Sequence, residues 1–213
     1  MGGIDIHTHR CNHNDNRRIG NLMAGRDSVP EGEGAFSIGI HPWYIDSCWR
    51  EQLVQLDGLL THDRRLVAVG ECGLDALASS SLELQLEVFE RQCAMAEKHA
   101  LPMILHVVKA HSQVLALRKR MGARMPWVIH GFRGKPALAL QYLQAGCYLS
   151  FGERFNPATP PVVPASHLLL ETDESDLSIC QIAEKVAQSC AIAPEELLQQ
   201  ATFNAEHLFF QNR

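Results

Sequence analysis

Apolar residues along the 213-residue chain fall into short runs that alternate with segments of helical periodicity. The runs predict strands buried on both faces, because they lack the polar alternation of a half-exposed strand. These predicted strands cover residues 3–6, 35–40, 66–70, 102–106, 127–130, 146–151 and 167–171. Predicted helices cover residues 51–60, 82–99, 112–121, 136–145, 178–190 and 194–208.

Alternating strands and helices predict a parallel sheet covered by helices. An open, doubly wound sheet and a closed barrel both fit this order. No strand is followed by a glycine-rich phosphate-binding motif, which disfavours nucleotide-binding folds. Residues 10–34 show no convincing second strand and helix. The length and the lack of any linker predict a single domain over residues 1–213.

Composition excludes several classes of protein. Hydrophobic residues make up 46% and charged residues 20% of the chain, which is a globular mixture and excludes disorder. No apolar stretch is long enough to span a membrane, and the first residues lack a signal-peptide pattern, so we expect a cytoplasmic protein without membrane partners. Lys and Arg total 19 against 24 Asp and Glu, which gives a net charge of −5. The protein therefore lacks a general electrostatic attraction for nucleic acid, and any binding of phosphates must depend on a few residues.

The cysteines and histidines indicate which kinds of covalent and metal-binding site the chain can form. The seven cysteines are odd in number, scattered and without a Cys-x-x-Cys pair, which argues against a disulfide framework and a zinc ribbon. We expect several of them, such as Cys93 and Cys190, to be small core residues. The eleven histidines are the unusual feature of the composition.

Metal-ligating residue types end five of the predicted strands. They are His7 and His9, Glu71, His106, His130 and, at the end of the seventh predicted strand, Asp173. One such residue at a strand end is commonly an ordinary polar residue, but five strand ends together indicate a site. In parallel β/α barrels the functional groups gather at these carboxyl ends. Imidazoles and carboxylates that converge there predict a site for one or two divalent cations.

The motifs around these residues resemble the TatD family of metal-dependent hydrolases, within the amidohydrolase-like barrels. The matching stretches are Ile4-Asp5-Ile6-His7-Thr8-His9, Ser37-Ile38-Gly39-Ile40-His41-Pro42, Val69-Gly70-Glu71-Cys72-Gly73-Leu74-Asp75, residues 85–106, Val128-Ile129-His130-Gly131-Phe132-Arg133-Gly134, Leu169-Leu170-Glu171-Thr172-Asp173 and Asn204-Ala205-Glu206-His207-Leu208-Phe209. They occur in family order over nearly the whole chain.

The resemblance implies a TIM-like parallel β/α barrel that binds a pair of divalent cations such as Zn, Mg or Mn. The implied ligands are His7, His9, Glu71, His106, His130 and Asp173. The resemblance also implies the activity of a metal-dependent deoxyribonuclease. A glutamate suits the bridging position, since each oxygen of Glu71 can reach one metal. Asp173 is then the expected general base for the attacking water.

Three departures from the family pattern bear on the substrate and the fold. Val107 stands where the family often has an arginine, and the family's long proline-rich loop after Asp173 is missing. Residues 10–34 are too short for a normal β/α unit, so we expect a reduced or distorted barrel of about seven strands.

Several other residues are candidates for the substrate pocket. Arg133 is the preferred anion contact, while Lys109 is either a substitute for the missing arginine or a solvent-facing helix residue. His41 is expected to line the pocket. Trp43 occupies a place where the family often has a histidine, and it either stacks on a base or covers the barrel mouth.

Three function classes remain open from the sequence. The first is a phosphodiesterase with DNA or a small phosphodiester as substrate. The second is a hydrolase of a small amide, ester or lactone on the same barrel, which the acidic charge and Val107 would suit. The third is a non-catalytic metal-binding protein, which retention of all six implied ligands disfavours. Oligomeric state has no signal in the sequence.

Overall fold

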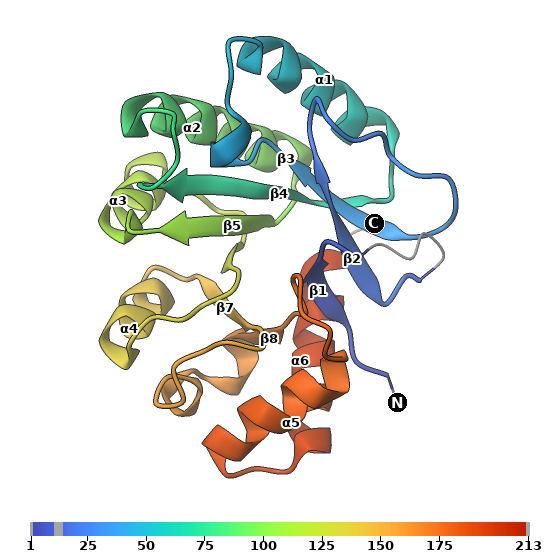
Figure 1. Ribbon diagram of the computed structural model, residues 1–213, viewed down its shortest axis with the longest axis vertical. Helices are drawn as coiled ribbons and strands as arrows, with labels where there is room; N and C mark the ends of the chain where they lie inside the picture. Colours follow the sequence, from blue (N-terminus) through green and yellow to red (C-terminus); the bar gives the residue numbers. More distant parts are fainter. Residues whose placement is uncertain (1, 11–14, 212–213) are drawn as a thin grey trace.

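The computed structural model describes residues 2–10 and 15–211. Within these residues, eight parallel strands form one sheet and follow one another around it in chain order (Figure 1). The strands are β1 (Asp5–Thr8), β2 (Arg18–Met23), β3 (Ala35–Gly39), β4 (Leu66–Asp75), β5 (Met103–Val108), β6 (Trp127–Ile129), β7 (Tyr148–Phe151) and β8 (Leu168–Leu170).

The sheet curls until its first and last strands meet. A parallel bridge between Thr8 and Asp173 joins the end of β1 to the segment after β8. The backbone N–H of Asp173 donates to the carbonyl of His7 at 2.9 Å, and the N–H of His9 donates to the carbonyl of Asp173 at 3.1 Å. The result is a nearly closed, TIM-like barrel, which confirms the predicted fold class.

The predicted count of seven strands is wrong, because β2 lies in the segment that shows no convincing strand. It pairs with β3 at five successive positions, from Ile19 opposite Ala35 to Met23 opposite Gly39. Gly20 and Asn21 weaken the strand signal, since both residue types are depleted in strands. The barrel is reduced in its helices instead, because residues 24–34 join β2 to β3 without a helix.

In the described part of the chain, six α-helices follow the later strands and cover the outside of the barrel (Figure 1). They are α1 (Trp49–His62), α2 (Leu82–His99), α3 (His111–Met121), α4 (Pro136–Gln144), α5 (Ile179–Cys190) and α6 (Pro194–Phe209), with short 3₁₀ turns η1 (Pro42–Tyr44), η2 (Pro160–Val162) and η3 (Ala165–His167). All six correspond to predicted helices, and α2 spans the predicted residues. Its start is capped by Ser81, whose hydroxyl accepts from the N–H of Leu84 at 3.3 Å.

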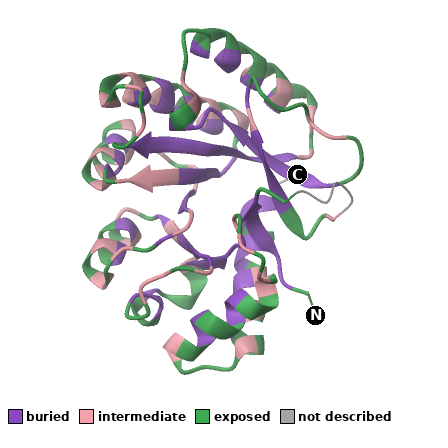
Figure 2. Ribbon diagram, in the orientation of Figure 1, coloured by how far each residue is buried: buried purple, intermediate pink, exposed green. Residues whose placement is uncertain are grey.

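The strands are largely buried, whereas the helices carry both buried and exposed residues (Figure 2), and the buried apolar residues form two clusters, a small one inside the barrel and a large one under the helices. Ile104 and Val128 belong to the small inner cluster, whereas their neighbours along β5 and β6 belong to the large cluster that packs under the helices. Strand side chains alternate between faces, so the residues two positions further on also point inward. Those residues are His106 and His130. The inward-facing side chains are therefore apolar in the middle of the barrel, and at the carboxyl ends of the strands they are residue types that can bind a metal.

The described residues bear on two further expectations. No helix among them is long and apolar enough to cross a membrane. The six cysteines at positions 48, 72, 93, 147, 180 and 190 are free thiols, with Cys93 buried and Cys190 half-buried. Cys11 lies outside the described residues.

Candidate metal centre

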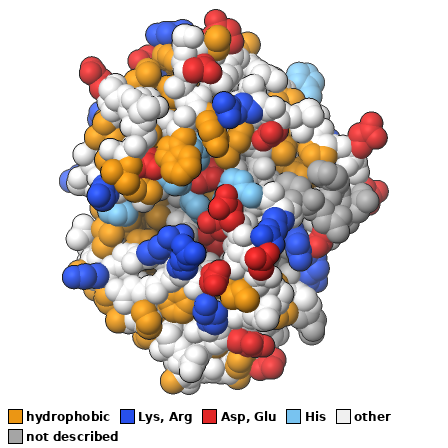
Figure 3. Space-filling view, viewed as in Figure 1, with side chains coloured by type: hydrophobic (Ala, Val, Ile, Leu, Met, Phe, Trp, Pro, Cys, Tyr) orange, Lys and Arg blue, Asp and Glu red, His pale blue; other side chains and the backbone are white. Residues whose placement is uncertain are grey.

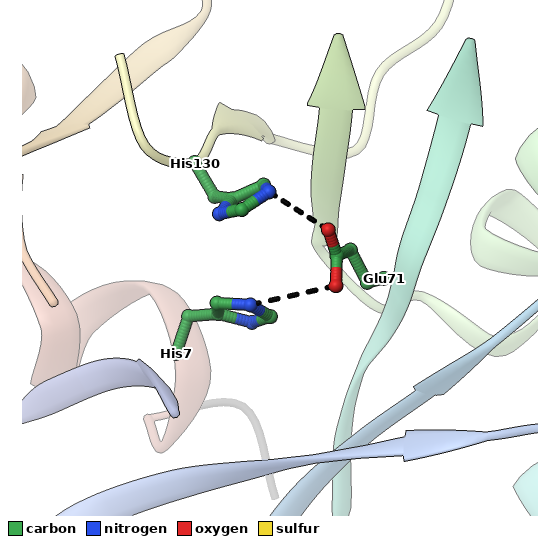
Figure 4. A group of neighbouring side chains, drawn as sticks. All are labelled: His7, Glu71 and His130. Atoms are coloured by element: carbon green, nitrogen blue, oxygen red, sulfur yellow. Dashed lines mark ion pairs between the residues drawn. The ribbon is translucent and has the colours of Figure 1, made fainter. Parts of the chain in front are cut away.

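Glu71, on β4, lies at the centre of the histidines, with 3% of its surface exposed. Its Oε2 atom faces the two histidines of the first strand, 3.6 Å from Nε2 of His7 and 3.4 Å from Nε2 of His9. Its Oε1 atom faces the opposite way, toward Nε2 of His130 at 2.8 Å (Figure 4). One carboxylate thus stands between two groups of imidazoles.

The group around Oε1 contains two more histidines. Nδ1 of His106 lies 2.9 Å from this oxygen, and Nε2 of His41 lies 3.4 Å from it. His41 is buried and its Nδ1 accepts from the N–H of Trp43 at 3.1 Å, so His41 faces Glu71 rather than open solvent. This places the predicted pocket residue inside the polar cluster.

Asp173 completes the group around Oε2. Its Oδ1 lies 3.8 Å from Nε2 of His7 and 3.6 Å from Nε2 of His9. All six side chains that the sequence suggested as metal ligands are therefore gathered at the carboxyl end of the barrel.

The donor atoms have the spacing and the chemistry that a divalent cation requires. Those of His7, His9 and Asp173 lie within 4.8 Å of one another, as do those of His41, Glu71 and His106. Both ring nitrogens of His7 are buried without a hydrogen-bond partner, an arrangement that is costly unless another group engages them. Imidazole nitrogens and carboxylate oxygens together suit zinc, manganese or similar cations, so the residues fit a metal centre.

Burial and the imidazoles set the ionisation of the cluster. Burial alone would raise the pKa of Glu71, but the imidazoles of His130, His106 and His41 hold it well below its ordinary value. Burial lowers the pKa of His7 to about 3, which keeps its ring neutral, as a ligand must be. Burial, together with the negative charge of Glu171, raises the pKa of Asp173.

Two carboxylates orient histidines of the cluster, and the sequence did not single them out as site residues. Nε2 of His106 lies 3.1 Å from Oδ2 of Asp75, and Nδ1 of His130 lies 3.2 Å from Oε1 of Glu171. A carboxylate on the far nitrogen fixes the tautomer of a metal-binding imidazole. Both acids stand in the quoted motifs, and Glu171 lies two positions beyond the inward-facing Leu169, which was the available signal.

Asn21, on the strand that the sequence did not reveal, holds Glu71 in place. Its Oδ1 accepts the backbone N–H of Glu71 at 2.8 Å and the hydroxyl of Ser37 at 3.2 Å, while its Nδ2 donates to Oε2 of Glu71 at 3.4 Å. Asn21 follows the inward-facing Ile19 by two residues, so it occupies the inner row of β2. A polar residue in that row had no local pattern to identify it.

A cavity of about 210 Å³ adjoins the cluster beside Asp173. It is lined by Arg133 and Arg154, together with Glu171 and Asp173. Lys109 is exposed just after β5 and does not line this cavity. Figure 3 shows one face of the molecule where histidines near the centre are flanked by acidic and basic side chains.

Comparison with known proteins identifies the family. Residues 8–210 match the family described as TatD related DNase. The chain belongs to this family. Family membership makes it a metal-dependent hydrolase that acts on ester bonds, which confirms the resemblance drawn from the motifs.

Relatives within the TatD family have different degrees of characterisation. The chain is 31% identical over 195 residues, 81% of its length and 76% of the relative, to YabD of Bacillus subtilis, an uncharacterized metal-dependent hydrolase. It is 36% identical over 152 residues, 66% of its length and 57% of the relative, to the protein named 3'-5' ssDNA/RNA exonuclease TatD of Cronobacter sakazakii.

A solved TatD homologue has the same fold. The crystal structure of YjjV from Escherichia coli aligns with a TM-score of 0.76 at 22% identity, covering 90% of this chain and 85% of that one. At this identity the likeness concerns the fold alone.

Proposed function

We propose that this TatD-family hydrolase cleaves phosphodiester bonds in single-stranded nucleic acid with a pair of divalent cations. The observation that carries the proposal is the position of Glu71, whose two oxygens face two separate groups of ligands (Figure 4). His7, His9, Asp173 and Oε2 of Glu71 would hold one cation. His106, His130 and Oε1 of Glu71 would hold the other, with His41 beside them. Similarity to a named ssDNA/RNA exonuclease supports the choice of substrate.

Individual side chains then have separate roles in the reaction. Cations bound there would supply Lewis acidity and lower the pKa of a water toward ~7. The Asp173 carboxylate, whose Oδ1 lies 3.6 Å from Nε2 of His9, accepts the proton of the attacking water. Glu171 and Asp75 hold the rings of His130 and His106 in fixed orientations.

Because the chain has a net charge of −5, we expect a few individual basic side chains to bind the phosphates of the substrate. Arg133 and Arg154 line the cavity beside Asp173, where a phosphate next to the scissile bond would lie. Neither arginine has an ion pair among the described residues, so both guanidinium groups are available to a ligand. Lys109, outside this cavity, stays a predicted contact for a more distant phosphate.

Asp173→Asn tests the proposal, because it keeps the shape of the side chain and removes its basicity. We expect hydrolysis of end-labelled single-stranded DNA by the metal-loaded protein to fall by about 10²–10⁴-fold. Arg133→Ala should mainly raise KM. Glu90→Gln is the matched control, since Glu90 is paired with Arg120 on the outer face of α2 and should be silent.

The substrate panel decides between phosphodiesters and other esters. Metal-loaded wild type should hydrolyse single strands faster than duplexes, and chelator should stop the reaction. If wild type leaves all nucleic acids intact but hydrolyses a neutral ester or lactone, the phosphodiesterase proposal is wrong. Equal DNA cleavage by Asp173→Asn and wild type would remove Asp173 from its role as the base.

A further inference from the structure

We propose that Trp43 is a stacking platform for a nucleobase of the substrate, a binding subsite beside the metal centre. The inference rests on the proposed function and deepens it, because a base-binding subsite suits nucleic acid and has no use for a simple ester. Trp43 lies in the turn η1 after β3, at the same end of the barrel as the ligand cluster, and 56% of its surface is exposed.

Exposure of one aromatic ring would mean little by itself, since surfaces commonly carry single apolar residues. The indole ring of Trp43 is held in place by a hydrogen bond at its edge. Its Nε1–H donates to Oδ2 of Asp75 at 2.6 Å, and the same oxygen lies 3.1 Å from Nε2 of His106. Asp75 is itself buried, with 1% of its surface exposed. A buried carboxylate therefore ties the indole to a predicted metal ligand.

The rings of two histidines hold the indole from a second side. Trp43 makes an edge-to-face contact with His41, with ring centroids 5.2 Å apart, and another with His106 at 5.9 Å. Its backbone N–H also donates to Nδ1 of His41. The ring is thus immobilised by its polar edge and its neighbours while more than half of its surface stays open to solvent.

An immobilised, open aromatic ring is what single-stranded nucleic acid binding requires. Bases stack on such rings without sequence preference, because every base has a π face. On the other side of the site, Arg133 and Arg154 line the cavity beside Asp173. A single strand whose phosphates meet these arginines and the metal centre would place an unpaired base over Trp43, whereas the paired base of a duplex would not be free to stack.

Intrinsic fluorescence can test stacking directly, because the other tryptophans are hidden. Trp49 and Trp127 are 5% and 0% exposed, so quenching by a ligand reports on Trp43. The probes are decathymidylate and an abasic decanucleotide of the same length, added to the metal-loaded Asp173→Asn protein so that turnover is suppressed. We expect decathymidylate to quench the emission and the abasic strand to leave it unchanged.

Variants in the same Asp173→Asn background separate stacking from the hydrogen bond to Asp75. Trp43→Leu should raise the Kd for labelled decathymidylate by about 5- to 150-fold and leave that for the abasic strand unchanged. Trp43→Phe keeps a ring without the N–H and should lose less than Trp43→Leu. Val54→Ala, at a 75% exposed apolar position on α1, is the matched control and should not change either Kd.

Two outcomes would overturn the subsite. One is an equal Kd for decathymidylate in the Trp43→Leu protein and its Asp173→Asn parent. The other is an equal loss in Trp43→Phe and Trp43→Leu, which would assign the effect to the Asp75 contact. Failure of the proposed function looks different, since wild type would then hydrolyse neither strand. The binding measurements involve no turnover, so they judge the subsite in either case.

Discussion

At the scale of the residue, the position of Glu71 depends on side chains outside the predicted ligand set. Its backbone N–H and one of its oxygens both contact Asn21, which reaches across from a neighbouring part of the barrel. Asn21 is 6% exposed, and it joins Glu71 to Ser37 through one side-chain oxygen. The bridging geometry of Glu71 is therefore supported by a residue that binds no metal in our proposal.

Asn21→Ala is expected to destabilise the protein and weaken its metal binding. The change leaves the buried N–H of Glu71 without a partner, which costs about 1–3 kcal/mol, or a fall in thermal midpoint of roughly 2–12 °C. Thermal unfolding of the metal-free protein and the metal content per chain measure the two effects.

Ser37→Ala is the matched control for that change. It removes one donor to Asn21 and leaves the hydrogen bond between Asn21 and the Glu71 N–H in place. Ser37→Ala should lower the thermal midpoint and the metal content less than Asn21→Ala does. If Asn21→Ala unfolds and binds metal as wild type does, Asn21 does not position Glu71.

At the scale of the element, the close approach of β4 to β5 brings Glu71 beside His106. Gly73 lies opposite His106 in this pairing and has a φ of +136°. A Cβ atom at Gly73 would lie 2.2 Å from the carbonyl oxygen of His106. Glycine is therefore required here by both the backbone conformation and the contact.

Gly73→Ala should push the two strands apart and lower the thermal midpoint by at least ~4 °C, for a loss of ~2 kcal/mol or more. Gly58→Ala is the control, since a Cβ at Gly58 in α1 meets nothing within 4 Å. That change should raise stability by up to ~1 kcal/mol, because alanine is the better helix former. Similar midpoints for the two variants would show that the contact with His106 is not limiting.

The packing of α1 on α2 includes an ion pair whose contribution depends on pH. Lys98 lies 2.7 Å from Oδ1 of Asp57, and Nε2 of His99 lies 2.7 Å from the same oxygen. Hydrogen bonds from Lys98 and His99 lower the pKa of Asp57. A lowered pKa in the folded state adds stability above the unfolded pKa, and this is lost as the pH falls through the folded pKa.

Asp57→Asn should therefore cost about 0.2–1 kcal/mol at pH 7, a small effect because the pair is partly exposed. The difference from wild type should shrink between pH 5 and pH 3, and also at 1 M salt. Urea unfolding at each pH measures it. A difference that is constant over this range would assign the effect to packing rather than to charge.

At the scale of the whole molecule, the candidate metal centre and the closure of the barrel share residues. Asp173 forms the bridge to Thr8 that joins the end of β1 to the segment after β8. Asp5 on β1 accepts from the N–H of Thr172 at 2.9 Å and from its hydroxyl at 2.6 Å. Ligands from both sides of this junction would be held together by a bound cation.

Removal of metal should therefore lower the stability of the entire barrel. At a free cation concentration 100 times its Kd, binding adds about 2.7 kcal/mol. Thermal scans of chelator-treated and reloaded protein should differ by roughly 5–11 °C. Glu71→Gln should lose most of this rise, and Glu90→Gln should keep it. A reloaded wild type that melts with the stripped protein would contradict the metal centre.

The sequence by itself determined the elements that have a local pattern. Six helices and seven strands are visible as periodicity, and α2 was predicted to the residue because its apolar spacing and its Ser81 cap are local signals. The ligand types at the strand ends were visible for the same reason. Side-chain alternation then predicts that residues such as His106 and His130 point into the barrel.

Only the tertiary structure decided the features that depend on partners distant in the chain. Strand β2 is stabilised by its pairing with β3 and by the contact of Asn21 with Glu71, 50 residues away. Glu71 lies where the pairing of β4 with β5 shifts its register, between Val69 and Cys72, and this pairing joins segments about 35 residues apart. Asp75 became a site residue for the same physical reason, since its partners Trp43 and His106 meet it only when the barrel has formed.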